Sequence, residues 1–439
     1  MRIFLKYTVP LAFCLLVTGI HTIVAQQQIT LSQAIETALK NNLDIQISKN
    51  ALSANTVNNY IGVAGGLPTV TGSFNTNEQV TGLNQELSNG TSTNRTGVVS
   101  NNTNMSVTAT MMLYNGGRVM ATKKRLEELQ KQSQEQVNTS VQNVIADVML
   151  KYFAVVQQQN FVATLLQSIE VSKQKLSLIE ARKSVGLSNE AEFLQANLDL
   201  NAQTQALQTQ KIVIEQSKAD LLRSLVLNPK TAITVVDTTI ELDKSLQWEN
   251  IEANIKKHPS ILSAEAQINV NLLLEREANA RRYPTVNLNT GYNYGRNQSG
   301  AGFTLLNQTY GPFLGVNASI PIYAGTANTR QVQVAKINTE TARLQKEVIA
   351  QNFQNTAAKS WEAYSNTLQL IESEKQNYEL ADRLLKLMNQ RFQLGQATII
   401  DVKQAQQSFE NSGYRLNNLS YTAKIAEITL KQIASQLGN

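Results

Sequence analysis

The hydrophobic pattern of the chain changes its period twice, first near residue 65 and again near residue 115. Residues 31–64 repeat apolar side chains at helical spacing, and a Gly65-Gly66 pair before Pro68 ends that segment. Residues 105–114 then alternate between apolar and polar side chains, which predicts a β-strand with one face exposed to water. Residues 69–74, 286–293 and 314–322 alternate in the same way. We therefore expect paired amphipathic strands of about ten to twelve residues, with polar loops at 81–102 and 295–309.

These segments belong to an internal repeat. The motif Leu67-Pro68-Thr69-Val70 recurs 216 positions later as Tyr283-Pro284-Thr285-Val286. From Tyr114, which matches Tyr323, the spacing falls to 209, so the first copy carries seven extra residues between Pro68 and Tyr114. We expect two copies of one unit, at 26–228 and 249–439, joined by a connector at 229–248.

A long helix follows each strand pair. Residues 119–182 contain neither Pro nor Gly and carry apolar side chains at heptad spacing, and residues 327–391 repeat this pattern. At a rise of about 1.5 Å per residue, such a helix is roughly 96 Å long. Gly186 and Gly395 can adopt the left-handed conformation that ends a helix. Shorter helices are predicted to return along the long helices at 189–227 and 397–437. Helices at 43–64 and 259–280 are predicted to pack against the remaining half of each long helix.

Four amphipathic strands are too few to close a membrane barrel, which needs about eight. An open edge in lipid leaves unpaired backbone groups that cost several kcal/mol each. Closed arrangements take strands from two, three or four chains, and an open channel favours three or more. Taken alone, the strands also fit an ordinary β-sandwich.

The N-terminus resembles a secretory signal at residues 1–25, with Arg2 and Lys6 ahead of an apolar core. Lipidation of Cys14, the sole cysteine, is disfavoured because the bulky Phe13 precedes it. Without this segment the chain keeps one imidazole, His258, and no thiol, which argues against disulfide scaffolds and thiolate metal sites. The net charge of +6 then falls by two, and the basic residues do not cluster as nucleic-acid binding requires.

The chemistry of the chain points away from catalysis. We find no metal-spaced His, Asp and Glu cluster, no glycine motif that would cradle phosphates, and no nucleophile paired with a base. We expect a protein that is not an enzyme and that holds no cofactor and no metal.

The duplicated order of helix, two strands, long helix, glycine turn and returning helix resembles the TolC family of outer membrane efflux proteins across residues 29–438. Two short motifs carry the resemblance: Leu31, Ala34, Ala38-Leu39 and Asn41-Asn42 at the start, and Tyr114-Asn115-Gly116-Gly117 after the second strand. The resemblance implies a mixed α+β membrane protein of a Gram-negative bacterium. It would be a homotrimer whose four strands per chain form a 12-stranded barrel in outer-membrane lipid, continuing as a coiled-coil tunnel through the periplasm.

The resemblance also implies a passive duct for small molecules that works with a periplasmic adaptor protein and an inner-membrane pump. An outlet for a secreted polypeptide, as in type I secretion, has the same fold and is the alternative. A periplasmic coiled-coil scaffold would explain the helices but not the four strands.

The site residues implied by the resemblance lie at the two helix turns. The adaptor would dock at the tips formed by Arg182, Val185, Gly186, Leu187, Arg391, Leu394 and Gly395. The alternative is that the glycines only end their helices. Asp401 matches an aspartate that rings the pore constriction in the family, and Gln404 stands where the best-known member has a second acidic residue. The alternative for Asp401 is a carboxylate that stabilises the first turn of its helix.

Overall fold

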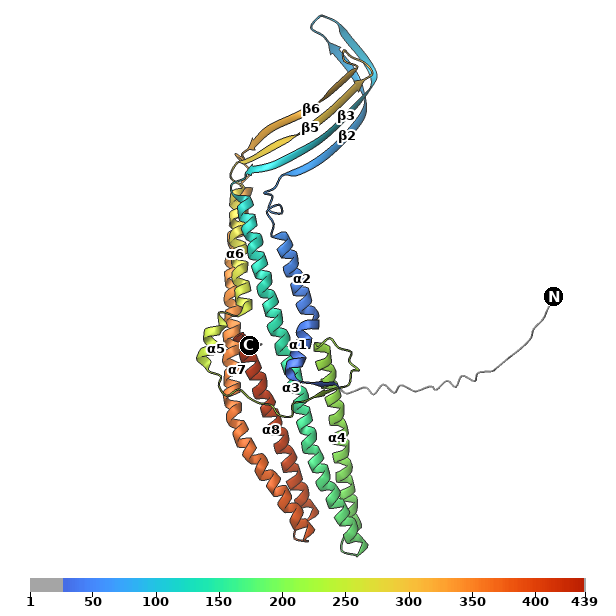
Figure 1. Ribbon diagram of the computed structural model, residues 1–439, viewed down its shortest axis with the longest axis vertical. Coiled ribbons are helices and arrows are strands. Elements are labelled where there is room, and N and C mark those ends of the chain that lie inside the picture. Colours follow the sequence, from blue (N-terminus) through green and yellow to red (C-terminus); the bar gives the residue numbers. More distant parts are fainter. Residues whose placement is uncertain (1–26, 438–439) are drawn as a thin grey trace, which may run out of the picture.

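The computed structural model describes residues 27–437 as an elongated molecule, with long helices at one end and a four-stranded sheet at the other (Figure 1). The proposed signal peptide, including Cys14, lies outside the described residues. No helix in the range 27–437 is long and apolar enough to cross a membrane.

The first half of the chain contains the following elements: β1 (Gln27–Ile29), α1 (Leu31–Asn41), α2 (Leu43–Asn58), β2 (Thr69–Glu86), β3 (Ser92–Tyr114), α3 (Arg118–Ser184) and α4 (Glu190–Ser224). The second half contains the following: β4 (Ile233–Val235), α5 (Trp248–Ile255), α6 (Pro259–Ala280), β5 (Thr285–Ser299), β6 (Leu306–Ser319), α7 (Ala327–Gln393) and α8 (Ile399–Ile433). The predicted long helices are confirmed, since α3 and α7 each run for 67 residues.

The helical prediction for residues 31–64 is confirmed for most of its length but wrong in extent, because Asn42 divides the segment into α1 and α2. Asn42 has ψ of 129°, outside the helical range, and its side-chain oxygen accepts from the backbone N–H groups of Asp44 (2.8 Å) and Ile45 (3.2 Å). This cap starts a new helix one residue after the previous helix ends. The helix α2 stops at Asn58, before the glycine pair.

The predicted loops at 81–102 and 295–309 are also wrong in extent, because the strands continue through most of both segments. The four strands are 18, 23, 15 and 14 residues long. Near the outer ends of the strands, Asn, Ser and Thr occur on both faces. The alternation of apolar and polar residues is therefore lost from the sequence there, although the hydrogen-bonded pairing of the strands continues. The seven extra residues of the first copy lengthen the β2–β3 hairpin beyond the point where Ser100 pairs with Ser299.

The sheet has the antiparallel order β2-β3-β5-β6, and its two faces differ in polarity. Residues directly opposite in the ladder share a face. One such row on the apolar face is Phe74, Met105, Tyr294 and Tyr310. The neighbouring row on the polar face is Ser73, Ser106, Asn293 and Gly311. The predicted amphipathic alternation is therefore confirmed.

The largest apolar cluster lies halfway along the helices, where α1, α3 and α4 meet the short parallel pair β1–β4. Tyr152 of α3 is fully buried at its centre. Its hydroxyl donates to Asp237 Oδ2 (2.8 Å) and lies 3.3 Å from the carbonyl oxygen of Ile29. This residue therefore ties the start of the described chain to the segment between the two halves.

His258 caps the first turn of α6, since its Nδ1 accepts from the backbone N–H of Ser260 (3.1 Å). The ring is buried and borders a cavity, and its centroid lies 4.3 Å from that of the Phe353 ring, with the two planes tilted by 44°. The other side chains around that cavity come from α3, α6, α7 and α8 and are uncharged: Thr139, Asn143, Ser260, Ile349, Asn352, Phe353, Thr356, Thr429, Gln432 and Ile433. Burial lowers the pKa of His258 below its usual value.

The lowered pKa of His258 predicts a loss of stability in mild acid. The unfolded chain takes up a proton on this imidazole near pH 6.5, whereas the folded chain takes it up only at lower pH, so stability is complete above about pH 6.5 and falls below it. His258→Asn keeps an N-cap acceptor and should lose this part of the pH dependence. Thermal unfolding of the detergent-solubilised protein between pH 5 and pH 7.5 measures the difference, and identical profiles for the two proteins would contradict it.

Candidate functional site at the helical tips

Both helix turns lie at the end of the molecule farthest from the sheet (Figure 1). At the first turn Gly186 has φ of +77°, its N–H donates to Lys183 O (3.1 Å), and the N–H of Leu187 donates to Arg182 O (2.8 Å). This pair of bonds is the Schellman motif, which favours glycine because of its positive φ. The prediction that Gly186 takes a left-handed conformation is confirmed.

The second turn repeats the same geometry. Gly395 has φ of +73°, its N–H donates to Phe392 O (3.1 Å), and the N–H of Gln396 donates to Arg391 O (2.8 Å). Apolar side chains stand out from both turns: Val185 is 67% exposed, Leu187 77% and Leu394 73%. Each tip therefore combines a tight turn with apolar side chains that the described chain leaves uncovered.

Arg182 joins the two tips to each other. Its Nη2 donates to Phe392 O (2.7 Å) and to Gln393 O (3.2 Å), which are carbonyls of the last turn of α7. The guanidinium carbon also lies 5.1 Å from the centroid of the Phe392 ring. These contacts satisfy helix-end carbonyls that have no partner within α7. In the described chain, Arg182 is therefore occupied by the neighbouring tip of the same protein.

Asp401 stabilises the first turn of α8 through a capping box with Thr398. Asp401 Oδ2 accepts from the backbone N–H and the hydroxyl of Thr398, both at 2.8 Å, and the Asp401 N–H donates to Thr398 Oγ1 (3.2 Å). These bonds, with a smaller effect of Arg391, lower the pKa of Asp401. Asp401 and Gln404 are both exposed, whereas Val402 and Ala405 in the same two turns of α8 are buried.

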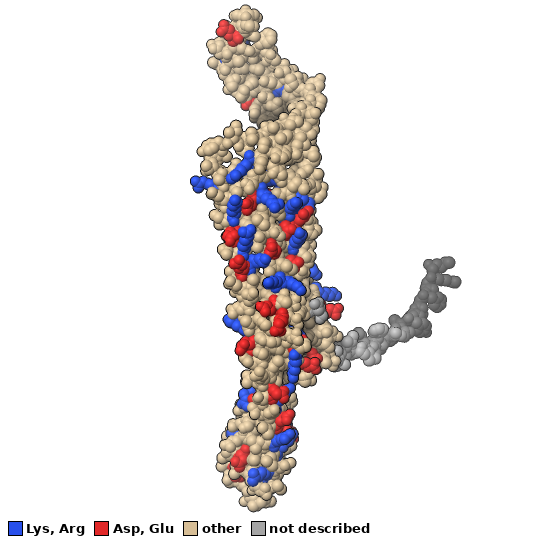
Figure 2. Space-filling model, turned by 90° about the vertical axis from the view of Figure 1, so that its left-hand side faces the viewer, with Lys and Arg blue, Asp and Glu red and all other residues tan. Residues whose placement is uncertain are grey.

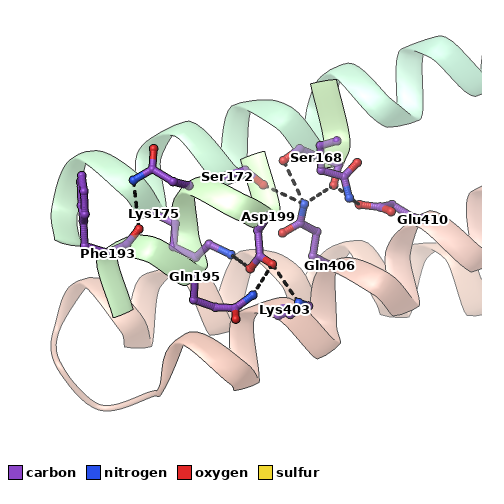
Figure 3. Close-up of polar contacts among 11 residues, drawn as sticks. Ser168, Ser172, Lys175, Phe193, Gln195, Asp199, Lys403, Gln406 and Glu410 are labelled. Carbon is purple, nitrogen blue, oxygen red and sulfur yellow. Dashed lines mark hydrogen bonds and ion pairs between the residues drawn. The ribbon is translucent and has the colours of Figure 1, made fainter. Parts of the chain in front are cut away.

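A partly buried ion cluster next to the tips is not indicated by the sequence pattern. Asp199 of α4 accepts from Lys175 of α3 (3.1 Å) and from Lys403 of α8 (2.8 Å), and Gln195 adds a third bond (2.8 Å) (Figure 3). The Lys175 side chain has no exposed surface. Burial alone would raise the pKa of Asp199, but the bonds from these three partners outweigh it and hold the pKa below its usual value.

A second polar group continues the cluster away from the tips. Gln406 Nε2 of α8 donates to Ser168 Oγ (2.5 Å) and Ser172 Oγ (2.9 Å) of α3, and Ser168 donates to Glu410 (Figure 3). Near the tips the core between the two helical hairpins thus mixes polar groups with small apolar clusters, whereas halfway along the helices the clusters are larger and apolar. The sequence does hold one indication of this polar core. Ser168, Ser172 and Lys175 occupy positions of the α3 heptad pattern where apolar side chains are expected.

Comparisons with known proteins agree with this architecture. A family model described as outer membrane efflux protein matches residues 34–225 and 250–436. The chain belongs to this family. Membership identifies the protein as an efflux channel of the TolC type from the outer membrane of a Gram-negative bacterium.

Two relatives and one solved structure illustrate the family. The outer membrane protein TolC of Vibrio cholerae is 24% identical over 328 residues, which cover 71% of this chain and 72% of that protein. The outer membrane efflux protein BepC of Brucella suis is 20% identical over 414 residues, covering 93% and 87%. The CmeC outer membrane channel of Campylobacter jejuni has the same fold, with a TM-score of 0.75 at 17% identity over 92% of this chain and 85% of that chain.

Proposed function

We propose that three copies of this protein form the outer-membrane duct of a tripartite efflux system and passively export small molecules. The observation that carries the proposal is the open sheet with one apolar and one polar face. Its outer strands, β2 and β6, each have one edge that pairs with no strand in residues 27–437. Three copies supply twelve strands, which is enough to close a barrel around an open channel.

The oligomeric state tests this proposal directly. The protein should fractionate with outer membranes, require detergent for extraction, and have the mass of three chains after the detergent contribution is subtracted. A stable, dispersed monomer in buffer without detergent would overturn the proposal. Resistance to small toxic compounds in an efflux-deficient host then separates small-molecule export from the type I secretion outlet.

We further propose that the tips are the docking points for the periplasmic adaptor, and that the adaptor connects the duct to the inner-membrane pump. The support is the exposure of Val185, Leu187 and Leu394 beside glycine turns whose backbone a foreign helix can approach closely. Arg391 lies in the same turn as Leu394, whereas Arg182 braces the tips internally.

Charge substitution at the tips should uncouple export. Leu187→Asp combined with Leu394→Asp is expected to remove resistance to toxic compounds, because a charged side chain in an apolar contact loses its hydration without a partner. Leu187→Met with Leu394→Met should keep resistance. The amount of trimer in outer membranes must stay equal for all three proteins, and full resistance in the Asp variant would exclude this docking surface.

We also propose that Asp401, repeated by three-fold symmetry, rings the constriction of the pore together with Gln404. A ring of carboxylates attracts multivalent cations, which would block the channel from that side. The carboxylate is exposed, and its Oδ2 serves the capping box while its Oδ1 makes no hydrogen bond within residues 27–437.

Asp401→Ala is therefore expected to weaken block by a trivalent cation roughly tenfold or more in planar bilayers. Thr398→Ala is the matched control, because it breaks the same capping box but leaves the carboxylate in place. Equal block in wild type and Asp401→Ala would leave Asp401 with its helix-start role alone.

A further inference from the structure

The polar face of the sheet is built almost wholly from side chains that are uncharged and form hydrogen bonds. Strand register assigns every residue to a face, since directly paired residues share one. From β2 and β3 the polar face receives Thr69, Thr71, Ser73, Asn75, Asn77, Gln79, Ser100, Asn102, Asn104, Ser106, Thr108 and Thr110. From β5 and β6 it receives Asn289, Gly291, Asn293, Gly295, Asn297, Ser299, Asn307, Thr309, Gly311, Phe313 and Gly315.

The charged residues of the strands stand elsewhere. Arg296 shares a row with Thr76, Thr103 and Gln308, on the same face as the apolar band and beyond its tyrosines. Glu78 lies one row farther out on that face, and Glu86 and Arg95 lie in the extension of the β2–β3 hairpin. Figure 2 shows the contrast on one side of the molecule, where the helices carry many acidic and basic groups and the sheet carries few.

Several groups on the polar face already bond to one another. The hydroxyls of Ser73 and Ser106 lie 2.6 Å apart across β2 and β3, and Thr110 Oγ1 donates to Asn289 Oδ1 (2.9 Å) across β3 and β5. Asn104 Nδ2 donates to Asn102 Oδ1 (3.0 Å) along one strand. Each amide and hydroxyl retains further donor or acceptor positions. The face thus offers fixed dipoles of both signs, and no net charge, to a passing solute.

We propose that this face is an uncharged lumen wall that passes anionic and cationic solutes alike, so that the sheet end of the duct does not select cargo by charge. Rings of charged side chains are what give pores a preference for one sign of ion. Three-fold repetition of the polar face supplies dipoles instead, and these leave the mean potential of a water-filled lumen near that of the solution. The inference rests on the proposed function, because it takes the polar face to line the pore.

The test compares the reaction rates of a cationic and an anionic methanethiosulfonate reagent with Ser106→Cys in outer-membrane vesicles. The chain has one cysteine, Cys14, in the proposed signal peptide, so the introduced thiol is the target in the mature protein. Rates are divided by those for free 2-mercaptoethanol, which removes the intrinsic difference between the reagents. The normalised ratio should lie within about twofold of one, and Ser73→Cys on the neighbouring strand should give the same result.

A charged neighbour calibrates the assay. Adding Asn104→Asp to Ser106→Cys places three carboxylates beside three thiols and should shift the ratio at least about fivefold toward the cationic reagent. A comparable shift of the normalised rate ratio in Ser106→Cys alone, toward either reagent, would overturn the proposal that the lumen wall is uncharged. If Ser106→Cys and Ser73→Cys react with neither reagent while Val107→Cys on the apolar face does, the polar face is not the lumen and the proposed function fails instead.

Discussion

Gly291→Val is expected to reduce the trimer in outer membranes at least about tenfold. A Cβ atom at Gly291 would lie 2.1 Å from Val107 O, 3.0 Å from Thr108 Cα and 3.0 Å from Phe313 Cε1. The first two obstacles are backbone atoms of β3, so a side chain at this position forces β3 and β5 apart. That pair joins the two hairpins of the sheet, and its loss leaves two separate two-stranded ribbons, which are marginal on their own.

Gly311→Val provides the matched control for Gly291→Val. Gly311 is on the same face, one strand away, and a Cβ atom there meets no neighbouring heavy atom within 4 Å. Heat-modifiable migration of the trimer and its amount in the outer-membrane fraction measure both variants. Normal assembly of Gly291→Val would show that the strands adjust to the added side chain.

Asp199→Ala is expected to destabilise the tips by about 3 to 5 kcal/mol, because it leaves the buried ammonium of Lys175 without its carboxylate. The loss should be local, since the apolar clusters farther along the helices are untouched. Hydrogen exchange of residues 168–200 should accelerate, and protease should cut at the tips, while exchange near Tyr152 stays unchanged.

Two comparisons separate this effect from a general loss of packing. Lys175→Met with Asp199→Leu removes both charges and should recover most of the protection. Glu215→Ala breaks a pair on α4 whose carboxylate is 71% exposed and should cost at most about 1 kcal/mol. Exchange in Asp199→Ala as slow as in wild type would contradict the prediction, because the tips would then not depend on Asp199 for their stability.

Periodicity made the long helices, their glycine turns and the amphipathic strands predictable. Each of these features depends on residues close together in the sequence, such as Gly186 after a helix free of proline and glycine. The strand ends were missed because Asn, Ser and Thr occupy both faces there. The break at Asn42 was missed because one capping residue interrupts a hydrophobic period without changing it.

The candidate site was less accessible from the sequence, because its contacts join distant segments. Arg182 was expected to face a partner protein, yet it binds carbonyls about 210 residues later in the chain. The ion cluster joins Lys175, Asp199 and Lys403 from three helices, and no local spacing indicates which lysine meets which carboxylate. Polar residues at core positions of α3 mark where such partners are needed but do not identify them.

The parallel pairing of β1 with β4 also determines the order in which the chain can fold during export. Residues Gln27–Ile29 leave the translocation machinery early, but their partner, Ile233–Val235, follows about 200 residues later. Gln27–Ile29 therefore cannot pair with β4 until Ile233–Val235 has also crossed the inner membrane.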